Sequence, residues 1–443
     1  MVNKRKVLER ILRFMTRAVL RKYRPLIVGI TGSVGKSSTK EAVTLVLGVG
    51  YTVRKADGNY NNEIGIPLTV IGARTGGSSF FRWLGVFLKW LSVMIFPVRY
   101  PEVLVLEMGI DRPGDMTFLL EFIPVNIGIV TQISSSHIAY FGTLQNIAKE
   151  KGRLIAALPA DGIAILNADD KRTLKMRDKT QAKVFTYGFE EPADIRADNF
   201  VFHRQASRAE GLSFKVNFDG KTLPLRLPKV VAKHHIPAAL AALSLGVALK
   251  MNLMEVIEAL EHFEPLPGRL RLLQGRDNTY VLDDTYNASP ASTRAALEVM
   301  GELMAPRKVA LLGDMLELGP DAEREHALLV EAVRASGVHI VVTVGKHMRA
   351  LHEQLLREGF SRKQVLWLPD PLSAVEAVMN IVRSEDLILV KGSQGIRMEM
   401  ITEQLLADPR TASSYLCRQT SEWRKKPFVP PTEWTEAISG YNL

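Results

Sequence analysis

The sequence predicts an α/β protein with two main domains, a central one with a mostly parallel sheet and a smaller, Rossmann-like one. Three observations support this prediction. A glycine-rich turn joins a short apolar run to a helical segment near the start of the chain. Apolar runs of strand length then alternate with helical or loop segments, which is typical of parallel sheets covered by helices. After a segment rich in proline and glycine, the same alternation begins again.

The glycine-rich turn lies in GITGSVGKSSTKE, residues 29–41, directly after the apolar run 26–30. A strand that ends in such a turn and leads into a helix points backbone N–H groups and the helix dipole at a phosphate. Lys36 would reach the β- and γ-phosphates, and the Ser37 hydroxyl would hold Mg²⁺. The strict P-loop pattern requires glycine at position 30, where this chain has Ile30. The predicted nucleotide-binding residues of the shorter motif are Thr31, Gly32, Ser33, Gly35, Lys36, Ser37 and Ser38. A glycine-rich turn with a surface lysine is the alternative, and it accounts less well for the flanking strand and helix.

Composition and charge limit the class of protein. The chain has 443 residues, 47% of them hydrophobic, which is enough for two or three domains. A single cysteine, Cys417, excludes a disulfide framework and a zinc ribbon and favours the reducing cytoplasm. The net charge is +10, and residues 1–24 carry +8 of it through nine Lys or Arg against Glu9. The rest of the chain is nearly neutral, which argues against nucleic acid as a partner.

Two amphipathic segments raise the question of a membrane surface. Residues 1–25 predict a basic helix with apolar residues at helical spacing, namely Leu8, Ile11, Leu12, Met15 and Val19. Such a helix either docks on the next domain or lies on an anionic membrane face. It is not a signal peptide, because arginines interrupt every apolar run.

The second segment, FFRWLGVFLKWLSVMIF at residues 80–96, lies in an apolar insertion at 76–100. It contains two cations and falls short of the roughly 20 apolar residues of a membrane span. It therefore suits a helix sunk into the lipid interface or one buried against protein. Together the two segments favour peripheral association with the inner face of a membrane, with packing against protein as the alternative.

The remaining elements follow in order along the chain. Strands are predicted at 103–107, 126–132 and 162–167, short antiparallel strands at 197–227, and an Ala/Leu-rich helix at about 235–249. FEPLPGRLRLL then marks the domain boundary, so the central domain is placed at 26–264 and the second at 265–410. Four apolar strands, in KVALLGDM, HIVVTVG, QVLWL and DLILVKGS, predict the Rossmann-like domain. It has no G-x-G-x-x-G and does not indicate a dinucleotide. Residues 411–443 are expected to form an irregular strap.

Nine stretches in order resemble the Mur ligase family, and within it the MurF branch, which adds D-alanyl-D-alanine to UDP-N-acetylmuramoyl-tripeptide. They are GITGSVGKSSTKE, GNYNNEIGIPLT, LEMGIDRPGDM, HIAYFGTLQNIAKEKG, ILNADD, PLPGRL, DDTYNASPASTRAAL, LLGDMLELG and LVKGSQGIRME, spread over residues 26–405. The resemblance implies an ATP- and Mg²⁺-dependent amide ligase. ATP would phosphorylate a muropeptide carboxylate, and an amine such as D-alanyl-D-alanine would attack the acyl phosphate.

The resemblance also assigns roles around the phosphates. Glu107 matches the family's Mg²⁺-binding glutamate, and His137 matches the histidine of a second Mg²⁺ site. Lys151 matches a lysine that many Mur ligases carbamylate to bridge metal ions. A chance acid at a strand end, a structural histidine and a solvated helix lysine are the respective alternatives. Asn61 and Asn62 of GNYNNEIG are expected near the substrate.

In the second domain, Arg269 of PGRL resembles an arginine that reaches the ATP phosphates. Asp284 matches an acid that orients nucleotide and domain closure, and Tyr286 and Asn287 would lie near the adenine. Residues Asp314, Lys391 and Ser393 match positions that line the site of the incoming amine. Polar residues at strand ends are otherwise often helix caps, yet ligands bind at this edge of such sheets.

Two departures from the family pattern stand out. The family's H-N-x-x-N reads KHHIPAAL here, so His234 matches the histidine while His235 and Ala238 replace the asparagines. The usual UDP-sugar-binding domain is also not evident before the loop. A lipid-linked or membrane-presented muropeptide is therefore the expected acceptor.

Three alternatives remain open at this point. A lipid-II-amidating relative usually bears a four-cysteine zinc ribbon, which a single cysteine disfavours. A folylpolyglutamate-synthase-like ligase is disfavoured by GNYNNEIG and DDTYNASP. A non-catalytic membrane-bound scaffold is the weakest alternative, because the loop and metal residues are all present.

Overall fold

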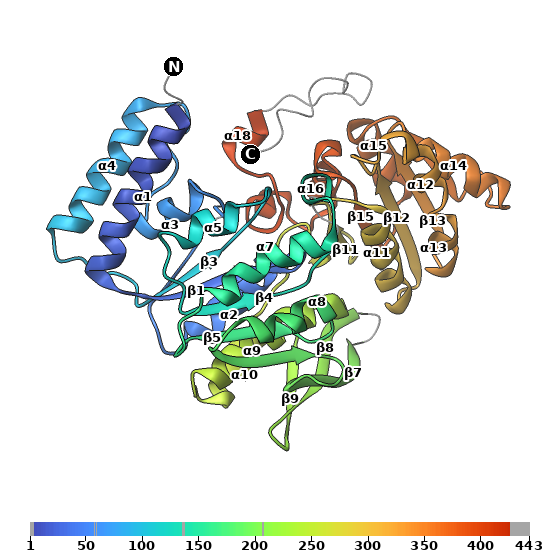
Figure 1. Cartoon of the computed structure of the whole chain (residues 1–443). Coiled ribbons are helices and arrows are strands. Elements are labelled where there is room, and N and C mark those ends of the chain that lie inside the picture. Colours follow the sequence, from blue (N-terminus) through green and yellow to red (C-terminus); the bar gives the residue numbers. More distant parts are fainter. Residues whose placement is uncertain (1–3, 57, 59, 135–137, 206–207, 426–443) are drawn as a thin grey trace. The chain divides into compact units, whose positions relative to one another are not determined.

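The computed structural model describes residues 4–56, 58, 60–134, 138–205 and 208–425. The chain forms two compact units (Figure 1). Unit 1 comprises Met1–Val201, Ser213–Leu227 and His234–Phe263. Unit 2 comprises Phe202–Leu212, Pro228–Lys233 and Glu264–Leu443. Each unit has its own sheet core, as expected for the α/β class.

The larger sheet has nine strands in the order β2-β3-β1-β4-β5-β6-β7-β8-β9. Its strands are β1 (Leu26–Thr31), β2 (Val53–Lys55), β3 (Val103–Glu107), β4 (Ile127–Val130), β5 (Ile163–Asn167), β6 (Lys183–Gly188), β7 (Ile195–Gln205), β8 (Arg208–Phe218) and β9 (Lys221–Leu227). The pairings from β2 to the start of β7 are all parallel. β1 therefore lies inside the sheet, between β3 and β4, and its carboxyl end opens beside theirs.

Helices cover both faces of this parallel sheet. On one face α2 packs against α9 and α10, and on the other α3, α5 and α7 pack over a core that includes Leu104 and Leu166. These and the remaining helices are α1 (Lys4–Tyr23), α2 (Lys36–Leu47), α3 (Gly65–Ile71), α4 (Phe80–Ile95), α5 (Asp115–Leu120), α6 (Ile138–Phe141), α7 (Leu144–Ala156), α8 (Lys171–Leu174), η1 (Lys175–Lys179), η2 (Lys233–His235), α9 (Ile236–Ala248) and α10 (Leu253–Glu261). The arrangement follows from strand runs that are apolar on both faces.

The two amphipathic segments form α1 and α4, which lie side by side next to α3 (Figure 1). Leu12, Met15 and Val19 of α1 are at most 3% exposed and pack into the cores of unit 1. The docking interpretation of the basic tail therefore holds for this face of α1, whereas Ile11 is half exposed. Within the described part of the chain, no helix is both long and apolar enough to cross a membrane.

Unit 2 holds a six-stranded sheet in the order β10-β11-β15-β12-β13-β14, in which only the edge strand β10 is antiparallel. Its strands are β10 (Arg271–Gln274), β11 (Tyr280–Asp284), β12 (Arg307–Gly313), β13 (Ile340–Val344), β14 (Val365–Leu368) and β15 (Asp386–Lys391). Alternate residues of each strand enter different cores. Ala310 and Leu312 face the core under α11, whereas Val309 and Leu311 face the core under α15 and α16.

Helices again cover both faces of the smaller sheet. They are α11 (Pro290–Glu302), η3 (Gly319–Asp321), α12 (Ala322–Ala327), α13 (Val330–Ala335), α14 (Met348–Arg357), α15 (Pro371–Ile381), η4 (Gln394–Ile396), α16 (Glu399–Leu405), η5 (Pro409–Thr411), α17 (Ala412–Tyr415) and α18 (Ser421–Lys425). The described part of the expected irregular strap thus contains short helical turns. Cys417 lies between the last two helices and is partly buried beside Thr285.

Candidate active site

The glycine-rich loop of unit 1 connects the carboxyl end of β1 to the first turn of α2. Gly35 adopts a left-handed conformation, with φ 86°, at the start of the helix. Gly32 also has a positive φ, and a Cβ atom there would overlap the side chain of Thr131, which directly follows the neighbouring strand β4. Thr31 is fully buried and donates a hydrogen bond to the Met108 carbonyl oxygen at 2.8 Å. The loop is therefore held against the sheet edge by both neighbouring strands, with the N-terminus of α2 at its end.

Two lysine side chains meet on this loop. The Nζ atoms of Lys36 and Lys151 each donate to the carbonyl oxygen of Gly32 at 2.9 Å. Lys151 comes from α7 and is 3% exposed, and burial together with the nearby charge of Lys36 lowers its pKa to about 7. The two amines thus gather at one point of the loop, where an anion would relieve their repulsion.

A carboxylate lies beside the loop on β3. Ser37 donates its hydroxyl to Glu107 Oε2 at 2.9 Å, and Asn61 donates its amide to Glu107 Oε1 at 3.4 Å. Glu107 is 4% exposed and stands opposite Ile30 in the strand register. The predicted metal residues Ser37 and Glu107, and the predicted substrate residue Asn61, are therefore neighbours.

One participant at this carboxylate was not predicted from the sequence. The ammonium of Lys40, buried on α2, lies 3.8 Å from Glu107 Oε2 and donates to the Ala56 carbonyl oxygen at 3.0 Å. Lys40 follows Lys36 by one helical turn in the motif, and that spacing on one helix face is the signal that would have found it. It supplies a positive charge behind the carboxylate.

For three other predicted residues, Asn62, His234 and His137, no contact with this loop is described. Asn62 accepts hydrogen bonds from the backbone of Ile64 and Gly65, so its side chain forms a turn at the start of α3. The exposed His234 contacts the ring of the buried His235, with centroids 4.2 Å apart. His137 lies outside the described residues. The roles assigned from the sequence to these three residues, in binding substrate, metal and nucleotide, stay predictions.

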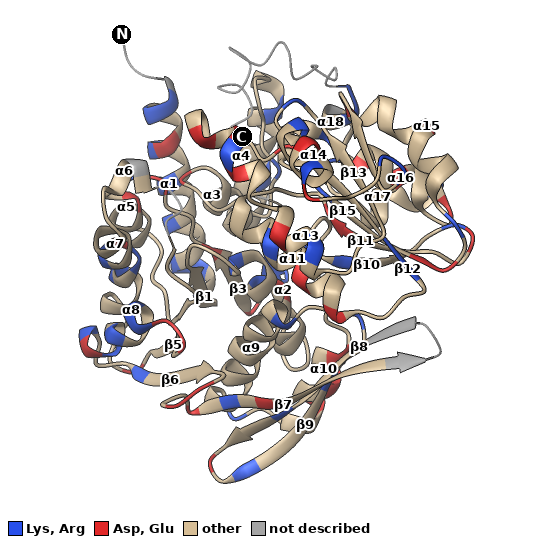
Figure 2. Ribbon diagram, turned by 90° about the vertical axis from the view of Figure 1, so that its right-hand side faces the viewer, with Lys and Arg blue, Asp and Glu red and all other residues tan. Residues whose placement is uncertain are grey.

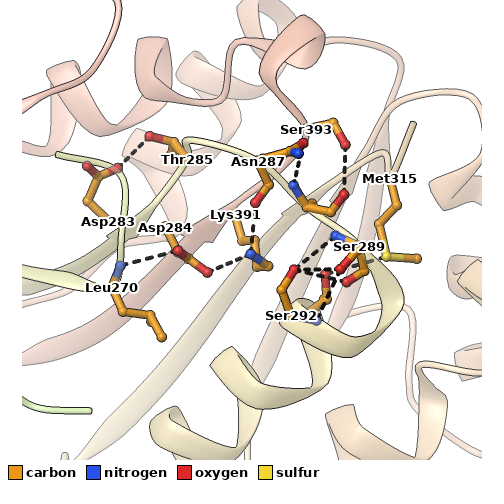
Figure 3. A network of polar contacts seen from close by, with 12 residues as sticks. Leu270, Asp283, Asp284, Thr285, Asn287, Ser289, Ser292, Met315, Lys391 and Ser393 are labelled. Atoms are coloured by element: carbon orange, nitrogen blue, oxygen red, sulfur yellow. Dashed lines mark hydrogen bonds and ion pairs between the residues drawn. The ribbon is translucent and has the colours of Figure 1, made fainter. Parts of the chain in front are cut away.

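Unit 2 gathers its predicted residues at the carboxyl ends of three adjacent parallel strands (Figure 3). Asp284 ends β11 and Lys391 ends β15, and the two form a buried ion pair at 2.6 Å. Lys391 also donates to the carbonyl oxygen of Asn287 at 3.0 Å, so it anchors the loop after β11. Ser393 donates to the Ala288 carbonyl oxygen in the same loop.

Arg269 lies over the ring of Tyr286, with its guanidinium carbon 4.1 Å from the ring centroid. Gly268 allows this approach, because it has φ 71° and a Cβ atom there would press on the backbone of Tyr286. The exposed Arg269 and the aromatic ring thus form one cation–π pair. The side chains of Tyr286 and Arg269 therefore lie against each other.

Asp314 follows β12 and is fully buried. Its Oδ1 accepts from the backbone of Met348 at 2.7 Å, while Oδ2 has no partner among the described residues. Burial raises the pKa of Asp314, and hydrogen bonds from the first residues around α14 oppose that rise. Gly345 makes room for the carboxylate, since a Cβ atom there would overlap it.

A second unpredicted residue supports the loop after β11 from the C-terminal strap. Arg418 is 8% exposed and donates to Glu399 at 2.8 Å, to the carbonyl oxygen of Tyr286 at 3.2 Å and to that of Thr285. Nothing in the local sequence around Arg418 points to this contact. It fixes the backbone that carries Tyr286.

The side chains available as metal ligands limit which metal ion can bind. Among residues 4–56, 58, 60–134, 138–205 and 208–425, no group of three or more His, Cys, Asp or Glu side chains could hold a metal ion. Ser37 and Glu107 nevertheless fit Mg²⁺, which usually takes one or two protein oxygens together with waters and substrate phosphates.

Comparison with known proteins identifies two matching domains. The family profile of the Mur ligase middle domain matches residues 91–246, and that of the Mur ligase glutamate ligase domain matches residues 268–394. The UDP-N-acetylmuramoyl-tripeptide–D-alanyl-D-alanine ligase of Escherichia coli strain K12 is 30% identical over 86% of this chain and 76% of its own length. The enzyme of that name from Bacillus subtilis strain 168 is 27% identical over 89% and 79%.

Solved structures agree in fold. MurF from Acinetobacter baumannii superposes with a TM-score of 0.74, at 22% identity over 91% of this chain and 80% of its own. MurF ligase from Thermotoga maritima in complex with ADP has a TM-score of 0.70 at 23% identity, over 91% and 84%. With both domain profiles matched and a 30% identical relative across most of its length, the chain belongs to the Mur ligase family of ATP-dependent C–N ligases and is of the MurF type.

Proposed function

We propose that the chain joins a muropeptide-like carboxylate to an amine such as D-alanyl-D-alanine, at the expense of ATP, in the cytoplasm. The observation that carries the proposal is the meeting of Lys36 and Lys151 on the Gly32 carbonyl oxygen, beside the Ser37–Glu107 pair. The names of the curated relatives supply the substrate class.

The reaction needs activation because a carboxylate has no good leaving group. The γ-phosphoryl group of ATP passes to a carboxylate oxygen of the substrate, which gives an acyl phosphate and ADP. The amine nitrogen then attacks the acyl carbon, the C–O bond to phosphate breaks, and a proton leaves the nitrogen. Little covalent chemistry falls to the protein, so positioning and charge neutralisation by groups such as Lys36 carry the catalysis.

Ser37 and Glu107 are proposed to hold Mg²⁺, which when bound neutralises phosphate charge and orients the phosphates. The hydrogen bond between the two side chains holds the Ser37 hydroxyl oxygen and a Glu107 carboxylate oxygen close enough to bind the same ion. Asn61 holds the other carboxylate oxygen of Glu107, so the carboxylate has one preferred orientation.

Lys151 is proposed to be carbamylated. Its pKa of about 7 leaves much of the amine neutral at neutral pH, and a neutral amine attacks CO₂ to give a carbamate and a proton. The product would be a carboxylate-like group next to the loop and Lys36. This is the role that the family resemblance assigns to Lys151.

The residues of unit 2 are proposed to act on nucleotide and amine. Arg269 and Tyr286 offer a cation and an aromatic face, which suit phosphate and adenine respectively. Lys391 joins the buried carboxylate of Asp284 to the backbone carbonyl oxygen of the exposed Asn287. Asp314 and Ser393 extend this set of polar groups along the sheet edge toward the predicted site of the amine.

The test is phosphate release across a panel of carboxylate and amine pairs, with product mass determined. We expect turnover only with a muropeptide carboxylate and a D-alanyl-D-alanine-like amine, and loss of at least 100-fold in Lys36→Ala and in Glu107→Ala while both remain folded. Lys363→Ala, an exposed lysine far along the chain, is the matched control. Normal turnover in Lys36→Ala would refute the ligase assignment. Turnover with ammonia would instead favour the lipid-II-amidating relative, and turnover with folate and glutamate would favour the folylpolyglutamate-synthase-like ligase.

A further inference from the structure

Helix α4 presents an apolar face that no described part of the chain covers. Only Val86 and Val93 of its 16 residues are buried. Phe80 and Phe81 are 75% and 81% exposed, although large aromatic side chains are rarely left in water. The other exposed large apolar side chains of α4 are Leu84, Phe87, Leu88 and Ile95.

This face continues onto α1. Phe14 of α1 is 65% exposed, and its ring lies 6.2 Å from that of Trp90, which in turn lies 5.5 Å from that of Phe87. Trp90 ties the helices together by donating to the Met15 carbonyl oxygen at 3.1 Å. We call the surface made by Phe14, Phe81, Leu84, Phe87, Leu88 and Ile95 the α1/α4 apolar face.

Positive charge surrounds this face. Lys6, Arg10 and Arg21 on α1, and Arg82 and Lys89 on α4, are exposed and have no acidic partner among the residues that the structure describes. The sequence has no acidic residue between Glu63 and Glu102, yet four cations. Figure 2 shows Lys and Arg in blue on both helices, with red near the start of α1. The acidic residues on that side are paired, since Arg5 contacts Glu9 and Glu63 and Arg13 contacts Glu121.

We propose that the α1/α4 apolar face is a binding site for an anionic lipid bilayer surface. A wide apolar face with cations at its margin is the composition of a helix that lies in the plane of the interface, with its apolar side chains below the headgroups. The cations of both helices would then meet the anionic headgroups. α4 lies on the bilayer rather than across it, because 16 residues fall short of the roughly 20 that a span needs.

The charge pattern argues against the other candidate occupants. Two copies of this chain joined through the face would bring like charges together, which opposes association. A protein partner would have to be both apolar at its centre and acidic at its rim. An anionic bilayer offers an apolar interior and acidic headgroups together, over an area larger than the face.

The test is flotation of the full-length protein with vesicles of phosphatidylcholine, with and without 30% phosphatidylglycerol, at low and high salt. Phe81→Ser/Leu88→Ser removes apolar contact at two positions that are already exposed, so the fold does not depend on them. Met254→Ser/Leu372→Ser is the matched control, because both residues are exposed to a similar extent elsewhere. Arg82→Gln/Lys89→Gln tests the charge, with Lys250→Gln/Lys363→Gln as its control.

We expect the wild type and both controls to bind anionic vesicles at low salt and to be released by high salt, since salt screens exposed charges. Phe81→Ser/Leu88→Ser should lower the partition coefficient at least tenfold. Each cation removed should lower it about fivefold. Failure of the wild type to bind, equal binding to neutral vesicles, or equal loss in the control variants would overturn the proposal. A concentration-dependent dimer that Phe81→Ser/Leu88→Ser dissociates, without vesicle binding, would assign the face to a second copy instead.

Discussion

At the scale of single residues, the amine of Lys151 couples protonation to stability. Its pKa falls from 10.5 to about 7 on folding, mainly through burial. Between these values the unfolded chain binds more protons than the folded one, so the free energy of unfolding should rise with pH from 7 toward 10. Below pH 7 the Lys151 amine is protonated in both the folded and the unfolded chain, so the folded state bears the full free-energy cost of a buried ammonium group.

Urea unfolding of the wild type and of Lys151→Met in CO₂-free buffer checks this expectation. The stability of the wild type relative to the variant should increase across pH 7 to 9.5, because Lys151→Met removes the titrating group and keeps most of its volume. Parallel curves for the two proteins would show that the amine is not desolvated. Adding bicarbonate should increase the difference further if the carbamate forms.

Lys40 should prove to be essential for stability although it was not predicted to have a role. Lys40→Met leaves the Glu107 carboxylate without its buried counter-charge and the Ala56 carbonyl oxygen without its donor. Breaking such a pair should cost about 3 kcal/mol, measured by urea unfolding. In Lys40→Met/Glu107→Gln part of that loss should be regained, and strict additivity of the two changes would mean that the residues do not interact.

The predictable part of the site is the part that is local in sequence. Lys36 and Ser37 could be assigned because the loop, its strand and its helix are continuous, whereas Glu107, at the end of β3, was assigned through the resemblance to the Mur ligase family. Arg418 could not, because its partners Thr285 and Tyr286 are more than 130 positions away and no spacing rule relates them. Lys40 lies within the motif, but its contact with β3 could not be predicted, since only folding brings Glu107 near it.

At the scale of elements, the turn between β1 and α2 tolerates no side chain at Gly32. Gly32→Ala combines a positive φ with overlap against Thr131, so we expect a loss of at least about 2 kcal/mol in stability and loss of ATP binding. Gly85→Ala on α4 is the matched control. A Cβ atom there meets nothing within 4 Å, and the change should stabilise by about 0.5 to 1 kcal/mol. Denaturant unfolding measures both, and equal effects would contradict the assignment of strain to the turn.

The long apolar strands were predictable and the short polar ones were not. β3, β12 and β15 are buried runs of Val, Leu and Ile, whereas β2 has only three residues, VRK, and β10 reads RLLQ. β11 ends in two aspartates that a core strand would normally exclude. Those aspartates are stable there because Gly268 donates to Asp283 and Lys391 pairs with Asp284, and neither contact is visible before the chain is folded.

At the scale of the whole molecule, nucleotide binding should appear as a gain in thermal stability. A ligand that binds only the folded state at 100 times its Kd adds about 2.7 kcal/mol. We therefore expect Mg²⁺–ATP to raise the Tm of the wild type and to leave Lys36→Ala unchanged, in differential scanning fluorimetry. Met254→Ser should respond like the wild type. An equal rise in Lys36→Ala would place the nucleotide away from the glycine-rich loop.

The packing of the strap against β11 makes the single thiol of this chain a built-in reporter. Burial raises the pKa of Cys417 to about 12, so at pH 8 almost none of it is thiolate in the closed state. Alkylation by iodoacetamide should therefore be slow while the strap is packed, and faster when the segment around Arg418 detaches and fully exposes the partly buried sulfur. The labelling rate of the unmodified protein, compared with that of a free thiol, therefore reports on that local opening without any engineered probe.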